Sequence, residues 1–436
     1  QQTYNTADLL LVSWLADDKA MAAIGATGSL IFMMLGLFNG FATGTAVLVA
    51  SSFGAKDHEK MYRSVHSTYA IALTSGLALT IIAFIFTPGI LTLMSTPADI
   101  FAEAVEYTRI YFLGSIPLLV YNLGTAILRS VGDSRTPLIY LIVSSVINIA
   151  LDLIFIGPFN MRSRGAAVAT VIAQVVTATM LTIKLSRADT VYKLNLKHIR
   201  FHKKETEEIF RIGIPAGIQM SLISFSNVLI QSRTNSFGYE AVAGVSAANR
   251  YDAFMGVGVQ SFTMAATTFT GQNYGARNYN RLRHGARTAT IMGAVYSLSI
   301  GILLIIYGQS LVAFFNDNPA VVDYGYRKMR VLAHFHFIFT IAQVLSGVIR
   351  GIGKSIVPMT ISVFSMVGVR TFWNYVVPDL LVQVPDWADF ARSIDLVFWS
   401  YPVSWVITFS LTMLYYFFGK GMPHKLKNQE RPALNT

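Results

Sequence analysis

The sequence contains no cysteine and little charge, and both deficits exclude classes of protein. Without cysteine among its 436 residues, the chain has no disulfide framework and no thiolate chemistry. Charged residues make up 13% of the chain, whereas ordinary soluble domains carry about 25%. Hydrophobic residues reach 53% and the mean hydropathy is +0.50. These values predict an integral membrane protein rather than a soluble one.

The sequence also lacks the patterns of common catalytic sites. It shows no nucleophile–base pair, no zinc-spaced cluster and no dinucleotide fingerprint. Its glycine-containing loops, such as FGAKD and GIGKS, lack the strand–loop–helix context and spacing of a phosphate-binding loop. We therefore expect neither an enzyme nor a cofactor or metal protein, and nothing in the sequence suggests nucleic acid.

Instead of catalytic motifs, the sequence has long apolar runs. A bilayer core about 30 Å thick requires about 20 apolar residues per helix. Runs of this kind predict an all-α protein with twelve spans: 1–15, 20–51, 59–87, 101–127, 136–157, 165–186, 209–236, 240–272, 285–311, 325–349, 355–379 and 391–419. The first run is short.

Lysine and arginine alternate between the predicted loops. Of the 34 residues, 23 fall in loops of one side, including the C-terminal tail, 5 fall on the other side and 6 lie within spans. By the positive-inside rule this asymmetry places both termini in the cytoplasm. The formal net charge of +11 is therefore mainly a topology signal.

Three pairs of motifs repeat at an offset of 221 residues. FGAKD (53–57) matches YGARN (274–278), LRSVGDSRTP (128–137) matches IRGIGKSIVP (349–358), and AMAAIG (20–25) matches AVAGVS (241–246). A shared offset indicates an internal duplication. It predicts two six-helix lobes related by a pseudo-two-fold axis along the membrane normal.

The duplication divides the chain into four predicted parts. They are an N-lobe at 1–186, a cytoplasmic linker at 187–208, a C-lobe at 209–419 and a cytoplasmic tail at 420–436. The second copy opens with an apolar stretch at 207–227, most of which has no counterpart in the first. We therefore expect about 15 to 20 further residues upstream of residue 1, which would complete the first helix.

Three carboxylates lie inside predicted spans: Asp8, Asp152 and Asp252. Burying a carboxylate in a membrane is expensive, at about 2.5 to 3.5 kcal/mol near the helix centre, so such residues mark pathways. Asn148 lies one turn before Asp152 on the same helix face. Tyr4 and Asn5 share a face with Asp8 and, with Tyr121, are also candidates for a substrate cavity, and Thr170 lies a few residues into the next span. Oxygen ligands of this kind suit H⁺ or Na⁺, although satisfied interhelical hydrogen bonds are the alternative, and the more probable reading for Asn148 and Thr170.

Other polar and aromatic residues support weaker interpretations. Arg250 and Asp252 are two apart and do not face each other, so we expect each to pair with another helix, with substrate binding as the alternative. His334 and His336 are interpreted as core histidines. Tyr121 is interpreted as packing, although aromatic cavities also suit apolar cations.

At this point the chain resembles the multidrug and toxic-compound extrusion (MATE) family. The resemblance rests on YNTAD, AMAAIG, FGAKD, GQNYGAR, LRSVGDSRTP, IRGIGKSIVP, NIALD and GAAVATVIAQ, and it covers nearly the whole chain. It implies two six-helix lobes around a central cavity. It also implies a bacterial inner-membrane exporter that exchanges organic cations for H⁺ or Na⁺ by alternating access.

The resemblance is closer to the DinF-like than to the NorM-like branch. The DinF-like branch implies a cation site in the N-lobe, and Asp8, Asn148, Asp152 and Thr170 match it, with Asn122 as a looser match. The NorM-like branch implies carboxylates in the seventh and tenth helices, but 209–236 contains none and 325–349 has only Asp323 at its mouth. We expect a monomer that contacts small organic compounds and the lipid bilayer.

A cluster of basic residues fits an organic-cation exporter less easily. Arg327, Lys328 and Arg330 lie in one predicted span, and Arg370 lies in another. Snorkelling to the membrane surface is the simple interpretation. The alternatives are an anionic substrate or a flippase for lipid-linked sugars.

Overall fold

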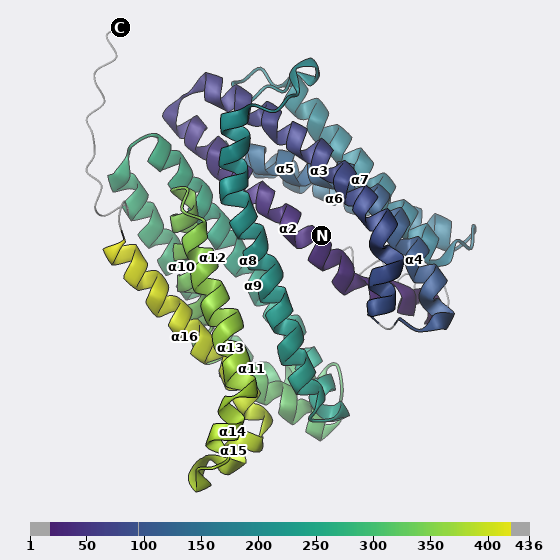
Figure 1. Ribbon diagram of the computed structural model, residues 1–436, viewed down its shortest axis with the longest axis vertical. Coiled ribbons are helices and arrows are strands. Elements are labelled where there is room, and N and C mark those ends of the chain that lie inside the picture. Colours follow the sequence, from purple (N-terminus) through teal and green to yellow (C-terminus); the bar gives the residue numbers. More distant parts are fainter. Residues whose placement is uncertain (1–17, 95, 420–436) are drawn as a thin grey trace. The chain divides into compact units, whose positions relative to one another are not determined.

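A computed structural model describes residues 18–94 and 96–419, and this part of the chain is helical with no β-strand. The chain divides into two compact units, Gln1–Gly217 and Ile218–Thr436. The boundary falls within helix α8 (Lys203–Asn235), two residues after Pro215. Figure 1 labels the helices and colours them along the sequence.

Among its described residues, the first unit has six α-helices before α8. They are α2 (Asp18–Ala55), α3 (His58–Leu93), α4 (Ala98–Leu113), α5 (Ser115–Ser130), α6 (Arg135–Ile156) and α7 (Arg162–Arg187), followed by the short η1 (Leu196–His198). Its main core packs α2, α3, α5 and α7 around Leu48, Tyr69, Leu123 and Leu181.

The second unit contains the rest of α8 and the helices that follow it. They are α9 (Tyr239–Gly275), α10 (Tyr279–Ala313), α11 (Pro319–Gly351), α12 (Ile356–Ser362), η2 (Val363–Val369), α13 (Arg370–Tyr375), α14 (Val377–Leu381), η3 (Pro385–Trp387), α15 (Ala388–Arg392) and α16 (Ile394–Phe418). Its cores lie between α9, α10 and α11, around residues such as Val348 and Met329.

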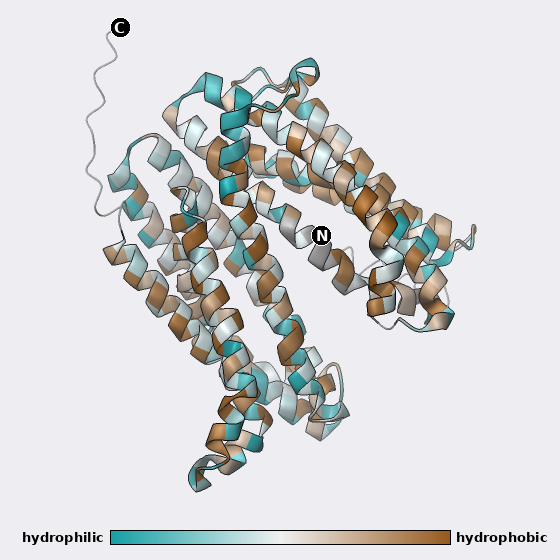
Figure 2. Cartoon of the chain, in the orientation of Figure 1, coloured by the Kyte–Doolittle hydropathy of each residue, from teal (hydrophilic) through white to brown (hydrophobic). Residues whose placement is uncertain are grey.

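Within residues 18–94 and 96–419, eight helices are long and apolar enough to cross a membrane, or nine if the bent pair α4 and α5 counts as one span. Helices α2 and α9 match predicted spans 20–51 and 240–272 in position. Neither is counted among the nine; α9 is rich in glycine and small polar residues, which favour close helix packing. Predicted span 1–15 lies outside the described residues. In Figure 2 the helices are largely hydrophobic, and hydrophilic residues gather at ends such as the start of α8.

Predicted span 101–127 was wrong as a single helix. The structure breaks it at Gly114 into α4 and α5, which meet at an angle of 47°. Pro117 lies in the first turn of α5. A proline has no N–H to donate to the preceding turn, so the helix cannot continue through this position with its normal hydrogen bonds.

Predicted span 355–379 is also less regular than expected. Between α12 and α13 the chain adopts a π-helical turn, η2, and the helix then ends at Tyr375. π-turns inside helices are rare and are frequent at functional sites. Arg370 is the first residue after this turn.

The segment between α7 and α8 packs against α3 through histidines. The backbone N–H of Asn195 donates to His66 Nε2 at 3.0 Å, and that of His202 donates to Ser67 Oγ at 3.0 Å. The hydroxyl of Tyr62 lies 2.5 Å from His198 Nδ1. The predicted linker extends to residue 208, but its last residues, 203–208, already belong to α8.

The internal duplication is visible in the backbone. Lys56 and Arg277 have φ angles of 56° and 55°, and Gly132 and Gly353 have φ angles of 97° and 85°. Each pair is separated by the predicted offset of 221 residues. These are left-handed conformations at tight turns after a helix, so the two copies end equivalent helices in the same way.

Candidate functional site

The buried face of α6 is a stripe with polar members. Its buried residues beyond the first turn are Ser144, Asn148, Asp152 and Ile156, spaced four apart along one side of the helix. Asn148 is 1% exposed and Asp152 is 0% exposed. The other faces carry exposed apolar residues such as Ile142 and Val146, as expected for a helix that faces lipid. The one side turned into the unit therefore carries polar side chains.

Helix α7 covers this stripe. Ser144 Oγ donates to the carbonyl of Ala173 at 3.1 Å, and a Cβ added to Gly165 would lie 3.1 Å from Cβ of Phe155. Two such contacts fix the antiparallel register of α6 against α7. Interpolation between them places Asn148 at the level of Thr170, which is 3% exposed. The predicted residues Asn148, Asp152 and Thr170 thus belong to one buried layer.

Gln174 belongs to the same layer, although it was not among the site residues predicted from the sequence. It follows Thr170 by one helical turn and is 6% exposed. A Cβ added to Gly114 would lie 2.3 Å from Gln174 Oε1, so the amide lies against the break between α4 and α5. Its spacing of four residues from Thr170 could have indicated that both side chains lie on the same face of α7.

The amides of this layer are incompletely satisfied. Within the described residues, neither side-chain polar atom of Asn148 or of Gln174 has a hydrogen-bond partner, and the same is true of Ser115 Oγ at the start of α5. Buried polar groups are almost always paired, because an unpaired one costs about 1 to 3 kcal/mol. Such a group of oxygen-bearing side chains around a buried carboxylate has the chemistry of a site for H⁺ or a hard cation.

The remaining N-lobe predictions have different outcomes. Asn122 is partly buried on α5. Tyr121 is buried in the main core and its hydroxyl donates to the carbonyl of Pro137 at 3.1 Å, so packing accounts for it. Asp8, Tyr4 and Asn5 lie outside the described residues. Within the part of the chain that the structure describes, no three His, Asp or Glu side chains gather as a metal site.

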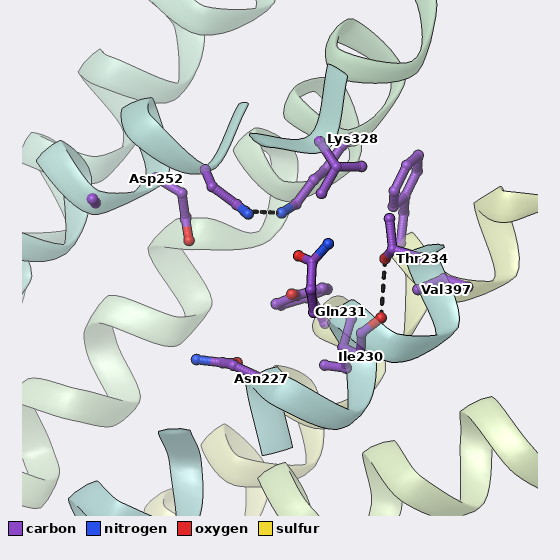
Figure 3. Close-up of a pocket in the computed structure, with 12 residues that line it drawn as sticks. Asn227, Ile230, Gln231, Thr234, Asp252, Lys328 and Val397 are labelled. Atoms are coloured by element: carbon purple, nitrogen blue, oxygen red, sulfur yellow. Dashed lines mark hydrogen bonds between the residues drawn. The ribbon is translucent and has the colours of Figure 1, made fainter. Parts of the chain in front are cut away.

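The second unit contains a cavity of about 240 Å³. Four helices line it: α8, α9, α11 and α16. Its lining residues are Asn227, Ile230, Gln231, Thr234, Val245, Asn249, Asp252, Ala253, Lys328, Val397, Phe398 and Tyr401. Figure 3 shows Asn227, Gln231, Asp252 and Lys328 directed toward a shared space. The predicted residue Asp252 therefore faces a cavity, whereas Arg250 is exposed and stacks on Phe315 with its guanidinium carbon 4.7 Å from the ring centre.

Two basic side chains are buried beside this cavity. Lys328 is 2% exposed and Arg370 is 4% exposed, so snorkelling to the surface does not account for them. Lys328 Nζ donates to Asn249 Oδ1. Arg370 donates from Nε to Ser404 Oγ at 2.8 Å and from Nη1 to Asn227 Oδ1 at 3.4 Å. These partners are all neutral.

Both cations also approach one aromatic ring. Lys328 Nζ lies 5.3 Å and the guanidinium carbon of Arg370 lies 4.5 Å from the ring centre of Tyr401. Cation–π contacts of this length are favourable but supply no negative charge. Asp252, the carboxylate of the cavity, has its Oδ1 3.5 Å from Nε2 of His336. His336 was interpreted from the sequence as a core residue, and it is 2% exposed. Its contact with Asp252 makes it a neighbour of this site as well.

Comparison with known proteins gives consistent results. The family model MatE matches residues 1–154 and 215–376. The chain is 29% identical over 406 residues to the probable multidrug resistance protein YoeA of Bacillus subtilis, covering 90% of this chain and 87% of YoeA. It is 24% identical over 359 residues to the multidrug export protein MepA of Staphylococcus aureus, covering 80% and 78%.

A solved structure supports the fold. An outward-facing multidrug resistance MATE family transporter of the MOP superfamily superimposes with a TM-score of 0.85, at 22% identity, over 95% of this chain and 90% of that one. This confirms the predicted all-α, two-lobe, twelve-helix membrane fold. Because the family model covers well over half of the sequence, the chain belongs to the MatE family of multi-pass membrane transporters.

Proposed function

We propose that the protein is a secondary active multidrug exporter coupled to an inward gradient of H⁺ or Na⁺. The observation that carries this proposal is the buried layer of Asn148, Asp152 and Thr170 in the first unit, together with the side-chain amides of Asn148 and Gln174, which have no partner among the described residues. The relatives YoeA and MepA, described as multidrug resistance and multidrug export proteins, support small organic compounds as substrates.

Coupling requires that the ion bind one conformation better than the other. A proton on Asp152 or a Na⁺ beside it would reduce the cost of burying a carboxylate in the interior of the unit, and would stabilise the state in which the layer is closed. Asp8 is expected to supply a second carboxylate to the same layer. This N-lobe arrangement is why we place the protein nearer the DinF-like branch.

The oxygen-bearing side chains of this layer suit H⁺ and Na⁺ equally. We assign the protein to the bacterial inner membrane on the family resemblance, and both termini to the cytoplasm on the distribution of lysine and arginine. Organic cations are the substrate class that the family resemblance implies. Export of anionic compounds, or flipping of lipid-linked sugars, is the second candidate, and the buried side chains of Lys328 and Arg370 favour it.

The test is gradient-driven transport in proteoliposomes that contain the purified chain. Ethidium, a fluorescent organic cation, is followed under an imposed pH gradient and separately under a Na⁺ gradient. We expect one gradient to drive transport by wild type and neither to drive it after Asp152→Asn. Asp99→Asn, which makes the same change at an exposed residue in the first turn of α4, is the control and is expected to transport like wild type.

Two results would contradict the proposal. If Asp152→Asn transports ethidium as fast as wild type under the same gradient, the layer on α6 and α7 does not couple transport. If wild type moves ethidium equally well with no gradient, the protein is not a secondary active exporter of this compound.

A further inference from the structure

The cavity of the second unit has a charge imbalance that packing does not explain. Within the described residues, no carboxylate lies within ion-pairing distance of Lys328 or Arg370. Burying a cation without a counter-charge costs several kcal/mol, so buried charges in proteins are normally paired. The neighbouring Arg327 shows the normal arrangement, because it pairs with Asp395 and Asp323.

The carboxylate in the cavity is already engaged elsewhere. Asp252 lies on α9 with its Oδ1 3.5 Å from His336, while Lys328 on α11 turns its Nζ to the amide of Asn249. Asp252 interacts electrostatically with both Lys328 and Arg370, so two cations share one carboxylate. The cavity therefore carries an excess of positive charge before any ligand enters.

The donors of the two cations are not exhausted. A lysine ammonium has three N–H donors, of which Lys328 uses one on Asn249. A guanidinium has five, of which Arg370 uses two, on Ser404 and Asn227. Lys328, Asn227, Gln231 and Tyr401 all line the cavity, so an entering acceptor would meet lysine and amide donors together.

We infer that this cavity binds the anionic group of an organic compound, a carboxylate or sulfonate on an aromatic body, with Lys328 as its principal counter-charge and Arg370 behind it. The apolar side chains of Ile230, Val397 and Phe398 line the same cavity and would contact the body of such a compound. An apolar cavity of about 150 Å³ holds one benzene molecule, so a cavity of 240 Å³ admits a group of about two fused rings.

The assignment deepens the export function proposed above and rests on it for its physiological meaning. It identifies organic anions, the second candidate substrate class above, as the ligands of this cavity in the second unit. The π-turn η2, directly before Arg370, supports it independently, because such turns are frequent where a helix is shaped to serve a site.

The test is calorimetric titration of the purified full chain in detergent, without any ion gradient. Three probes share one ring system: naphthalene-2-sulfonate, the neutral 2-naphthylmethanol and the cation 2-naphthylmethylammonium. We expect wild type to bind the sulfonate at least tenfold more tightly than either of the others. Equal affinity for the three probes, or tightest binding of the cation, would overturn the assignment.

Two substitutions move the affinity in opposite directions. Lys328→Gln removes the counter-charge and is expected to weaken sulfonate binding at least tenfold. Asp252→Asn removes the competing negative charge and is expected to strengthen it at least threefold, a gain that a folding defect does not produce. Arg330→Gln makes the same charge change on an exposed residue of the same helix and is expected to leave binding unchanged.

If Lys328→Gln and Asp252→Asn both bind the sulfonate as wild type does, the cavity is not an anion site. A water-soluble short-chain phosphatidylglycerol, added as a competitor, separates a lipid headgroup from a free organic acid as the source of the anion. Because no gradient is present, failure of ion coupling at Asp152 leaves these titrations unaffected, and the two proposals stand or fall separately.

Discussion

Arg327 and Lys328 are neighbours on α11, yet they have opposite electrostatic surroundings. The guanidinium of Arg327 pairs with the carboxylates of Asp395 and Asp323 and is about one third exposed. Lys328, one residue on, is 2% exposed and has the neutral Asn249 as its hydrogen-bond partner. The charge of Arg327 therefore stabilises the fold, whereas burying the charge of Lys328 destabilises it.

This difference predicts opposite effects on stability. Lys328→Met removes a desolvated charge and keeps the volume, so we expect the free energy of unfolding to stay the same or rise by about 1 to 2 kcal/mol. Arg327→Met leaves two carboxylates without their partner and is expected to lower it by about 1 kcal/mol, since the pair is partly exposed. Thermal melting of the two purified variants measures both changes. A lower melting temperature for Lys328→Met than for Arg327→Met would mean that Lys328 is a structural residue.

The first unit contains a close helix crossing that predicts a severe steric effect. A Cβ added to Gly40 of α2 would lie 2.3 Å from the carbonyl oxygen of Gly213 and 2.4 Å from the backbone nitrogen of Gly217, both in α8. Because these are backbone atoms, the helices must move apart to admit a side chain. We expect Gly40→Val to lower stability by about 3 kcal/mol and to reduce the amount of folded protein in the membrane.

Gly25, in the same helix, is the matched control for Gly40. Within residues 18–94 and 96–419, no atom lies within 4 Å of the position that its Cβ would occupy. Gly25→Ala is expected to leave stability unchanged or to raise it slightly, since alanine is the better helix former. Size-exclusion profiles and melting temperatures of the two variants check the pair. Equal behaviour of Gly40→Val and Gly25→Ala would show that α2 and α8 do not cross as described.

The fold was largely predictable because its determinants are local or repeated. Apolar runs set the spans, and motifs at one offset indicated the duplication, which the matching φ angles of Lys56 and Arg277 then displayed. The burial of Asn148 and Asp152 on one face followed from their spacing of four. The break at Gly114 was missed because hydropathy records apolar length and is insensitive to the backbone donor that Pro117 lacks.

The second site was harder to predict, because its parts are remote in the sequence. Asp252 and His336 are on different helices, and only packing brings them within 3.5 Å. The sequence did not distinguish Lys328 from its neighbours Arg327 and Arg330. A basic residue within a span has the same sequence pattern whether its side chain reaches the membrane surface or is buried beside a cavity. Burial is a property of tertiary structure, and it separated the three.

The contact between α3 and the segment that links α7 to α8 predicts that docking of this segment depends on pH. His202 lies before α8, where burial, aided by the nearby Arg200 and Arg63 and opposed by Glu205, lowers its pKa below the ordinary value of 6.5. The neutral ring is therefore favoured when the linker is docked, and it accepts a hydrogen bond from Arg200 Nε at 3.2 Å. Docking should be strongest above pH 6.5 and should weaken as the pH falls below that value toward the lowered pKa.

Hydrogen–deuterium exchange of residues 188–202, corrected for intrinsic rates, measures this effect between pH 7.5 and 5.5. We expect protection to fall with pH in wild type and to change less in His202→Gln. His58→Gln, at an exposed histidine at the start of α3, is the control and should retain the wild-type slope. The same slope in His202→Gln as in wild type would assign the pH response to another group, such as His66.

The unsatisfied amide of Asn148 predicts a separation of function from stability. Asn148→Leu keeps the number and branching of the side-chain heavy atoms and removes a buried polar group whose amide atoms lack partners within the described residues. Stability should therefore be unchanged or slightly higher, whereas gradient-driven transport should fall at least tenfold if the amide oxygen serves the coupling ion. Ser144→Ala, one turn earlier on the same stripe, loses a hydrogen bond to Ala173 and is expected to lower stability by about 1 kcal/mol while transport continues. Melting temperatures and proteoliposome transport rates, measured on the same preparations, give both quantities. If Asn148→Leu melts well below wild type, the amide is a structural group and the ion site does not include it.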